Sequence, residues 1–160
     1  MKGIMDSQFI SYIEALKPKL IELLKMPPVT PENLPKIMPE KGIYLLSEGE
    51  QHLYVGRSNN IRKRIARHSN PGATHRMAAF AFRLAREKTG YRKATYKKGE
   101  GSRDSLMQDP IFIASFSSAK ERIRKMSLRF VEEANPVTQA LLEIYVAVVL
   151  NTPYNDFDNH

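Results

Sequence analysis

The chain has 160 residues, a formal net charge of +8 and no cysteine. This length predicts a single compact domain with a true hydrophobic core. The lack of cysteine excludes disulfides, thiolate metal sites and cysteine nucleophiles, and it suits a cytoplasmic protein. No apolar segment approaches the roughly 18 residues that crossing a bilayer requires, so we expect no membrane partner.

Residues 1–40 predict a helix followed by a proline-rich connector. Apolar residues recur at helical spacing from Ser7 to Lys25, and Pro18 is expected to kink or divide this helix, which should pack across the sheet or its edge. Five prolines in residues 26–40 exclude a regular helix or a central strand. We interpret this range as a linker into the first strand; a ligand for a proline-recognition domain is the alternative.

Two β-rich apolar runs, Gly42–Leu46 and His52–Gly56, predict a β-hairpin closed by a five-residue polar loop, Ser47–Gln51. A helix should follow at once, with Ser58 or Asn59 as its cap. Its buried stripe would be Ile61 and Ile65. Arg64 and His68 share nearly that same face, where solvated charge is not expected.

The middle of the chain predicts a helix and then a basic segment. Arg76 to Lys88 has amphipathic spacing, with Met77, Phe80, Ala81 and Leu84 inward. Thr89 to Arg103 is expected to be a mobile loop, part of an insertion at about residues 89–118. It is either a surface insertion or a flap in which Tyr91 or Tyr96 stacks on a base while lysines follow the backbone.

The C-terminal part predicts a third strand and a long helix. Met126 to Val131 alternates with period two, with Met126, Leu128 and Phe130 on one face, and Ala119 to Lys125 predicts only a short helical turn before it. Asn135-Pro136 is a strong helix start, because a capping amide precedes a proline whose missing N–H costs nothing there.

The helix over residues 137–150 contains one acid, Glu143, among aliphatic residues. A buried carboxylate is costly unless it is paired or metal-bound, which makes Glu143 a candidate site residue. An outward-facing glutamate, or a structural partner for Arg64, explains it equally well from this helix alone.

Positive charge is concentrated in residues 57–98, which contain thirteen Lys and Arg against one acid, Glu87. Such a segment suits a polyphosphate, because each cation that neutralises a phosphate releases condensed counterions. A merely solvated basic face is the alternative. The sequence contains no P-loop, zinc spacing or nucleophile elbow.

The hairpin and the helix after it resemble the core of the GIY-YIG nuclease superfamily. Gly42-Ile43-Tyr44 matches the first half-motif, and Tyr54-Val55-Gly56 is a conservative form of the second. Arg64 and His68 fall where that family places an arginine and commonly a histidine. Glu143, followed twelve residues later by Asn155 in Pro153-Tyr154-Asn155, matches the end of the family's nuclease domain. The resemblance covers about residues 39–157, less a divergent middle.

The resemblance implies an α/β (α+β) domain over residues 41–160, with a small, mainly antiparallel three-stranded sheet flanked by helices and extended by the N-terminal helix. It implies that Glu143 is the sole protein ligand of one Mg²⁺ or Mn²⁺ ion. Arg64 would stabilise charge on the phosphoryl oxygens, and Tyr44 would activate water, with Tyr54 and His68 orienting it or the phosphate. The expected substrate-binding residues are Arg57, Arg62, Lys63, Lys93, Lys97, Lys98 and Asn155.

The expected function is therefore metal-dependent hydrolysis of DNA, with RNA not excluded as a substrate and a separate protein partner possible for targeting. The alternative from another class is a non-catalytic nucleic-acid-binding module that retains the fold. The polar tail from Asp156 to His160 is expected to fray rather than bind metal.

Overall fold

The computed structural model describes residues 4–91 and 102–158. Its contacts divide the chain into a sheet unit, residues Met1–Arg62 with Ser127–His160, and a helical unit, residues Lys63–Met126. The positions of these parts relative to one another are not determined. The sequence predicted a single compact domain in which residues 1–40 lead into the part over residues 41–160, and in the structure the proline-rich connector belongs to the sheet unit.

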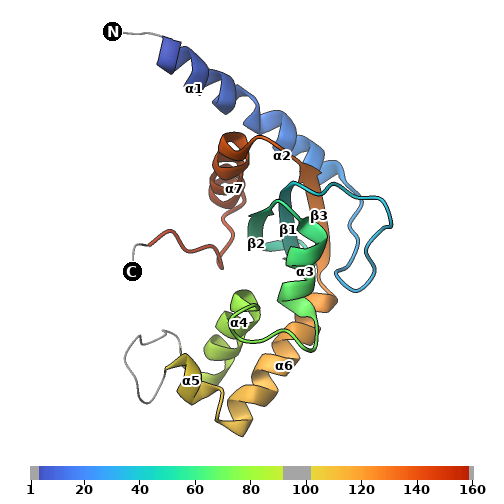
Figure 1. Ribbon diagram of the computed structural model, residues 1–160, viewed down its shortest axis with the longest axis vertical. Coiled ribbons are helices and arrows are strands. Elements are labelled where there is room, and N and C mark those ends of the chain that lie inside the picture. The colour runs from blue at the N-terminus through green and yellow to red at the C-terminus, as the bar shows by residue number, and fades with distance from the viewer. Residues whose placement is uncertain (1–3, 92–101, 159–160) are drawn as a thin grey trace. The chain divides into compact units, whose positions relative to one another are not determined.

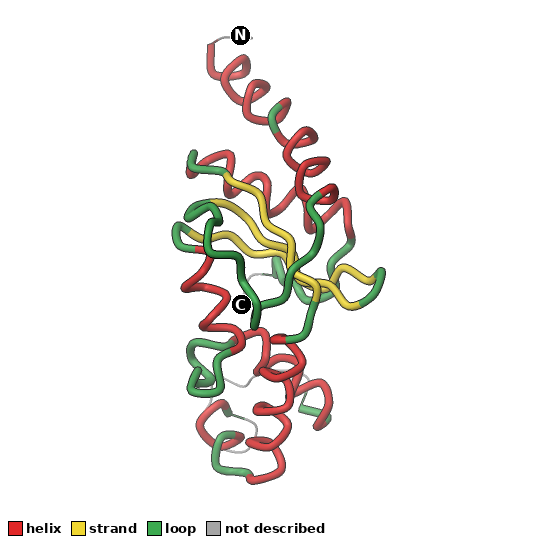
Figure 2. Tube along the Cα trace, turned by 90° about the vertical axis from the view of Figure 1, so that its right-hand side faces the viewer, coloured by secondary structure: helices red, strands yellow, loops and turns green. Residues whose placement is uncertain are grey.

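The sheet unit is built on three antiparallel strands in the order β2-β1-β3. Figure 2 shows the strands in yellow. They are β1 (Gly42–Glu48), β2 (Gln51–Ser58) and β3 (Ser127–Glu132). This arrangement confirms the predicted hairpin and third strand. The hairpin loop is shorter than predicted, because the strands extend to Glu48 and Gln51 and leave only Gly49 and Glu50 between them. Gly49 has φ +57°, a conformation that a residue without a Cβ adopts easily.

Two helices cover one face of this sheet. They are α2 (Leu16–Lys25) and α7 (Pro136–Leu150), and their apolar side chains form one core with those of the strands (Figure 1). The buried residues of that core are Leu16, Leu20, Leu23, Ile43, Leu45, Val55, Val131, Leu142, Val146 and Ala147. The predicted packing of the N-terminal helix on the sheet is confirmed for α2.

The break in the N-terminal helix lies earlier than predicted. α1 (Ile4–Glu14) ends before Ala15, and Pro18 is the third residue of α2 rather than the point of division. Proline is tolerated there because the first N–H groups of a helix have no intrahelical acceptor. The connector that follows α2 contains no regular helix or strand in the structure, as predicted, but Val29 forms an isolated bridge with Leu128 at the edge of β3.

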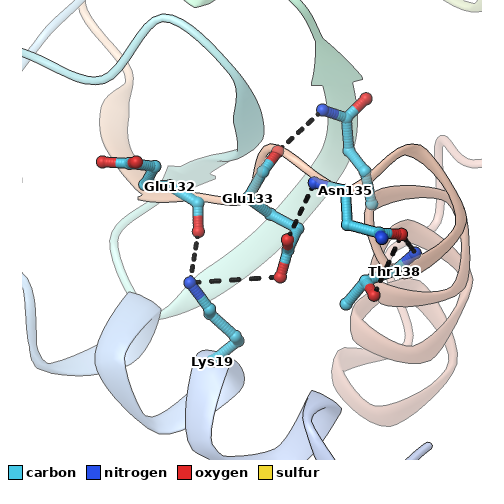
Figure 3. A network of polar contacts seen from close by, with 6 residues as sticks. Lys19, Glu132, Glu133, Asn135 and Thr138 are labelled. Atoms are coloured by element: carbon cyan, nitrogen blue, oxygen red, sulfur yellow. Dashed lines mark hydrogen bonds and ion pairs between the residues drawn. The ribbon is translucent and has the colours of Figure 1, made fainter. Parts of the chain in front are cut away.

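α7 begins where the sequence predicted it. The Asn135 side chain accepts hydrogen bonds from the N–H groups of Val137 and Thr138, both at 3.0 Å, and Pro136 is the first helical residue. Figure 3 shows how the turn before this helix is held: Lys19 of α2 donates to the Glu132 carbonyl, and the Glu133 carboxylate, 4.0 Å from the Lys19 ammonium, accepts from the Asn135 N–H. The start of α7 is thereby fixed to α2.

The helical unit contains most of α3 (Ile61–Ser69), which begins with the last two residues of the sheet unit, and then α4 (Ala79–Thr89), α5 (Arg103–Leu106) and α6 (Pro110–Arg124). Pairing of α4 and α6 gives the unit its core, in which Phe82 packs against Phe112 and Phe116 with ring centroids 5.1 and 6.2 Å apart. None of the helices in residues 4–91 and 102–158 is long and apolar enough to cross a membrane.

Two predictions for the middle of the chain were wrong in detail. α4 starts at Ala79, so Met77 lies in the preceding turn and is exposed instead of pointing inward. Residues 119–124 are the end of a helix of 15 residues with Lys125 as its C-cap, not a short turn. The proposed insertion at 89–118 therefore holds α5 and most of α6. Asp109-Pro110 starts α6 with the same signal that was recognised at Asn135-Pro136, since Asp109 accepts from the Ile111 N–H.

Candidate active site

Tyr44 occupies the centre of the sheet and is fully buried. It lies opposite Gly56 on β2 and Phe130 on β3. A Cβ atom added at Gly56 would lie 2.3 Å from the Tyr44 hydroxyl oxygen, far inside van der Waals contact. The phenol thus lies directly over the glycine. This explains why a residue without a side chain is needed at Gly56: it is the close approach of the Tyr44 ring that requires it.

Tyr54 lies on the same face of the sheet as Tyr44. It is half-buried, and the centroids of the two rings are 6.3 Å apart with an interplanar angle of 46°. Alternation along a strand places both tyrosines on the face opposite to Ile43 and Val55, and therefore opposite to the face that α2 and α7 cover. The two predicted tyrosines are thus brought together at the β1–β2 pair.

Glu143 and Arg57 form an ion pair on the other face of the same strand. The Arg57 Nε atom lies 3.8 Å from a Glu143 carboxylate oxygen, and the side chains are 47% and 26% exposed. Arg57 pairs with Ile43 across the strands, which places it on the side where α7 packs. Glu143 therefore points toward β2 with its carboxylate open to solvent, and it is neither a buried core group nor a fully outward-facing one.

Asn155 is bonded to the outer edge of β2, between Tyr54 and Gly56. Its side-chain oxygen accepts from the Val55 N–H at 2.9 Å, and its amide nitrogen donates to the Val55 carbonyl at 2.7 Å. The same oxygen accepts from the Thr152 hydroxyl, and the Tyr154 N–H donates to the Leu53 carbonyl. Asn155 thus mimics a neighbouring strand residue and fixes the chain after α7 to β2.

Gln139 is a buried polar residue of α7 that the sequence analysis missed. Its amide nitrogen donates to the Glu133 carbonyl at 3.0 Å and lies 3.4 Å from the Ser58 carbonyl and 3.5 Å from the Asn59 side-chain oxygen. Because Gln139 lies one turn before Glu143, these bonds fix that face of α7 to the end of β2. A neutral polar residue inside an apolar helical run was the signal in the sequence.

Arg62 holds the connector rather than pointing freely into solvent. Its guanidinium donates to the Pro35 carbonyl at 2.5 Å and to the Lys36 carbonyl at 3.3 Å. The start of α3 is tied to the same region by the Ile61 N–H, which donates to the Glu40 carbonyl. Ser58, one of the two predicted caps, accepts from the Asn60 N–H just before the helix.

Arg64 and His68 lie one turn apart on α3 and belong to the helical unit. His68 is buried, and its ring meets Phe80 edge to face with centroids 6.3 Å apart. Burial, with the nearby charges of Arg64 and Arg67, lowers the pKa of His68 from 6.5 to about 3. His68 is therefore a neutral imidazole at neutral pH. Lys63 of this unit is exposed, whereas Lys93, Lys97, Lys98 and Tyr96 lie outside the described residues.

Comparison with protein families decides between a chance tripeptide match and a true relationship. The model of the GIY-YIG catalytic domain matches residues 40–107, which hold the hairpin, α3, α4 and α5. This match supports membership of the GIY-YIG nuclease superfamily. No curated protein and no solved structure matches it at a significant level.

The matched range covers fewer than half of the residues of the chain. Tyr44, Tyr54, Arg57, Arg64 and His68 lie inside it, whereas Glu143 and Asn155 lie beyond it. The three-stranded antiparallel sheet flanked by helices agrees with the GIY-YIG fold. The family match and the sheet therefore support a GIY-YIG fold, and the roles of the individual residues are part of the proposal below.

Within residues 4–91 and 102–158, no group of three or more His, Asp and Glu side chains could hold a metal ion. A GIY-YIG site with one carboxylate does not require such a cluster. Mg²⁺ is usually bound through one or two carboxylates, with water and substrate phosphates as the other ligands. The Glu143 carboxylate fits that pattern, since its side chain is 26% exposed.

Proposed function

We propose that the chain is a metal-dependent endonuclease that hydrolyses phosphodiester bonds in DNA. The observation that carries this proposal is that an acid, a cation and a phenol all lie at the edge strand β2. A partly exposed carboxylate, Glu143, is paired with Arg57 on one face of this strand, and Tyr54 lies on the other face. Acids, cations and phenols are groups that can assist water attack on a phosphodiester. The nuclease domain proposed here spans residues 41–160.

Glu143 is the residue that would hold one Mg²⁺ or Mn²⁺ ion. When bound, such an ion supplies positive charge to the phosphate oxygens and to the attacking water. Arg57 has a second role in this scheme. In the free protein it neutralises the Glu143 carboxylate, and with substrate present its forked donors suit a phosphate oxygen. Because the Glu143 carboxylate and the substrate phosphate compete for its guanidinium, Arg57 is a substrate-binding residue that also stabilises the Glu143 carboxylate when no substrate is bound.

The two tyrosines take different parts because they differ in burial. Tyr44 is fully buried over Gly56, whereas Tyr54 is half-buried and reachable by water. We therefore assign contact with the attacking water to Tyr54 and the support of its ring to Tyr44, reversing the roles that the family resemblance implied. A phenol with a pKa of about 10 is a weak base at neutral pH, so nearby cations must favour its phenolate.

Arg64 is proposed to stabilise the charge that develops on the phosphoryl group. His68 is proposed to orient the phosphoryl group as a neutral hydrogen-bonding residue. A positively charged His68 is incompatible with its low pKa. Arg62 and Asn155 already bond to backbone groups of the protein, which supports a positioning role for both. Phosphate contact is left to Arg57, Lys63, Lys93, Lys97 and Lys98.

The test is a plasmid-nicking assay with Mg²⁺ or Mn²⁺ using Glu143→Gln, which keeps the shape of the side chain and removes its charge. We expect nicking to fall by at least about a hundredfold, as loss of a central electrostatic group does. DNA binding in chelator should be unchanged. Glu132→Gln is the matched control, since its carboxylate lies exposed on the same unit at the end of β3. Full nicking by Glu143→Gln would remove the mechanism.

Arg64→Ala separates chemistry from binding. Its charge is needed chiefly in the transition state, so kcat should fall much more than affinity. Equal losses in rate and affinity would instead make Arg64 a binding residue. Binding by the unmodified chain without nicking of supercoiled, linear or branched DNA, or of RNA, would favour the non-catalytic nucleic-acid-binding module.

A further inference from the structure

The helix α7 is apolar on two sides, and only one of them is covered. Leu142 and Val146 belong to the core on the sheet. Val137, Ile144 and Val148 are exposed, and with Leu141 they follow one another at spacings of four, three and four residues. This is the spacing of a helix seam that packs against another helix. A helix that is apolar nearly all round is normally buried on all sides.

The helix α1 extends this uncovered surface. Phe9 and Ile13 continue, at the same heptad spacing, the stripe that Leu16, Leu20 and Leu23 form on α2. The three leucines are buried in the sheet unit, but Phe9 and Ile13, and their neighbour Ile10, are not. Figure 2 shows α1 continuing away from the strands, so the apolar stripe extends beyond the core that covers its α2 part. α1 also contacts α7.

These side chains define what we call the α1–α7 face: Phe9, Ile10, Ile13, Val137, Ile144 and Val148. Each is between 43% and 66% exposed. At about 200 Å² for a fully exposed large apolar side chain, the face presents on the order of 600 Å² of apolar surface. That equals the largest patches on ordinary monomers, and with a polar rim it approaches the roughly 800 Å² per partner of a stable interface.

We propose that a second copy of this chain covers the α1–α7 face in a symmetric dimer. A two-fold axis pairs a surface with itself, which suits two helices that each carry an apolar seam. The charges of the two helices permit this choice. Two chains of net charge +8 repel each other, but α1 and α7 contain no Lys or Arg, and their acids in the described residues are Asp6, Glu14 and Glu143. The proposal does not depend on nuclease activity.

Pairing would also stabilise α1. The helix has 11 residues, and isolated helices shorter than about 12 to 15 residues are marginal in water. Most of its side chains are exposed, and its apolar stripe has no core beneath it in the sheet unit. A second copy would supply the missing surface for packing.

Sedimentation of the full chain over a range of concentrations tests the dimer. We expect a reversible dimer, and we expect Val148→Asp or Ile13→Asp to weaken it at least about a hundredfold, because each places two uncompensated charges in an apolar interface. Ile37→Asp and Ile111→Asp are matched controls, since these residues are 93% and 75% exposed and lie off the face. Circular dichroism and urea unfolding verify that every variant is folded.

The absence of cysteine allows an independent check. Val148→Cys should form a covalent dimer with a short bismaleimide linker, whereas Ile37→Cys should not. A monomer at all concentrations, a larger assembly in place of a dimer, or a dimer unaffected by both aspartate variants would each overturn the proposal. A monomer at all concentrations would mean that a different protein covers the α1–α7 face.

Discussion

The two units of the chain carry charge of opposite sign. The sheet unit has nine Lys and Arg against twelve Asp and Glu, while the helical unit has sixteen against five. Most of the family motif, with Glu143, lies in the unit that is net negative. Most cations that suit a phosphate backbone lie in the other. The proposed function therefore predicts that chemistry and substrate affinity respond mostly to different mutations, with Arg57 and Arg64 as the exceptions.

The two units also differ in the charge of their buried polar groups. In the sheet unit, Gln139 and Thr138 are buried neutral groups that bond to the backbone or to another neutral side chain. In the helical unit, Arg86 and Lys120 are buried cations. Arg86 donates to the Tyr91 carbonyl, and Lys120 to the Pro71 and Ala73 carbonyls at 2.7 and 2.8 Å. Burial and neighbouring cations lower the pKa of both.

Gly56→Ala should give the largest effect and should damage the sheet unit. The new Cβ would lie 2.3 Å from the hydroxyl oxygen of a tyrosine that is buried at the sheet centre. We expect a loss of about 3 kcal/mol or more in the free energy of unfolding, with loss of nicking. Urea unfolding measures it. Gly72→Ala in the helical unit is the control, because no atom lies within 4 Å of its added Cβ. Equal unfolding midpoints would contradict the close packing described here.

Acid should weaken the helical unit through His68. The pKa of this group is about 3 in the folded protein and near 6.5 in the unfolded chain. Between those values the unfolded chain binds a proton that the folded protein does not. Stability is therefore full above about pH 6.5 and falls as the pH decreases toward 3, by at most about 1.4 kcal/mol per pH unit.

Unfolding free energies at pH 7.5 and 4.5 measure this dependence. His68→Gln should reduce the acid loss by about 2 to 3 kcal/mol. His52, in the sheet unit, is the comparison: its pKa is lowered by partial burial and by Arg129, and its Nδ1 atom lies 2.8 Å from the Ser47 hydroxyl. His52→Gln should retain most of the acid sensitivity. An unchanged acid loss in His68→Gln would place the titrating group elsewhere.

In each unit, replacing one side chain that hydrogen-bonds to two backbone groups should give a smaller effect, a loss of about 1 to 3 kcal/mol in the free energy of unfolding. Asn155→Leu leaves the Val55 N–H and carbonyl without their partner, and Lys120→Met does the same to two carbonyls. The loss at Lys120 should be the smaller one, since the change also removes repulsion from Arg124. Thermal unfolding with and without added phosphate measures both, and a larger loss for Lys120→Met would reverse the comparison.

Substituting the lysines of the basic segment should leave stability unchanged and alter only the salt dependence of binding. Lys93, Lys97 and Lys98 lie outside the described residues, so this prediction comes from the sequence. Their joint replacement by Ala should flatten the slope of log K against log salt by up to about three units, at about 0.9 per neutralised phosphate. Fluorescence anisotropy with duplex DNA measures it. An unchanged slope would place recognition on other cations.

The sequence predicted the hairpin, β3 and α7 because each has a local cause: alternation of apolar residues, or a cap followed by proline. It misjudged α6, although Asp109-Pro110 carries the same signal as Asn135-Pro136. It identified Glu143 as the acid in an apolar helix. It did not reveal Gln139, or that Asn155 bonds to Val55 one hundred residues earlier, because both depend on contacts between distant segments.

The bonds from Tyr154 and Asn155 to Leu53 and Val55 have a consequence for aggregation. β2 is an edge strand, and its outward N–H and carbonyl groups would otherwise be open to pairing with a strand of another molecule. The chain after α7 occupies that edge at Leu53 and Val55 without adding a strand. Truncation before Thr152 would uncover the edge while leaving every helix and strand intact, so the shortened chain should form β-type aggregates where the full chain does not.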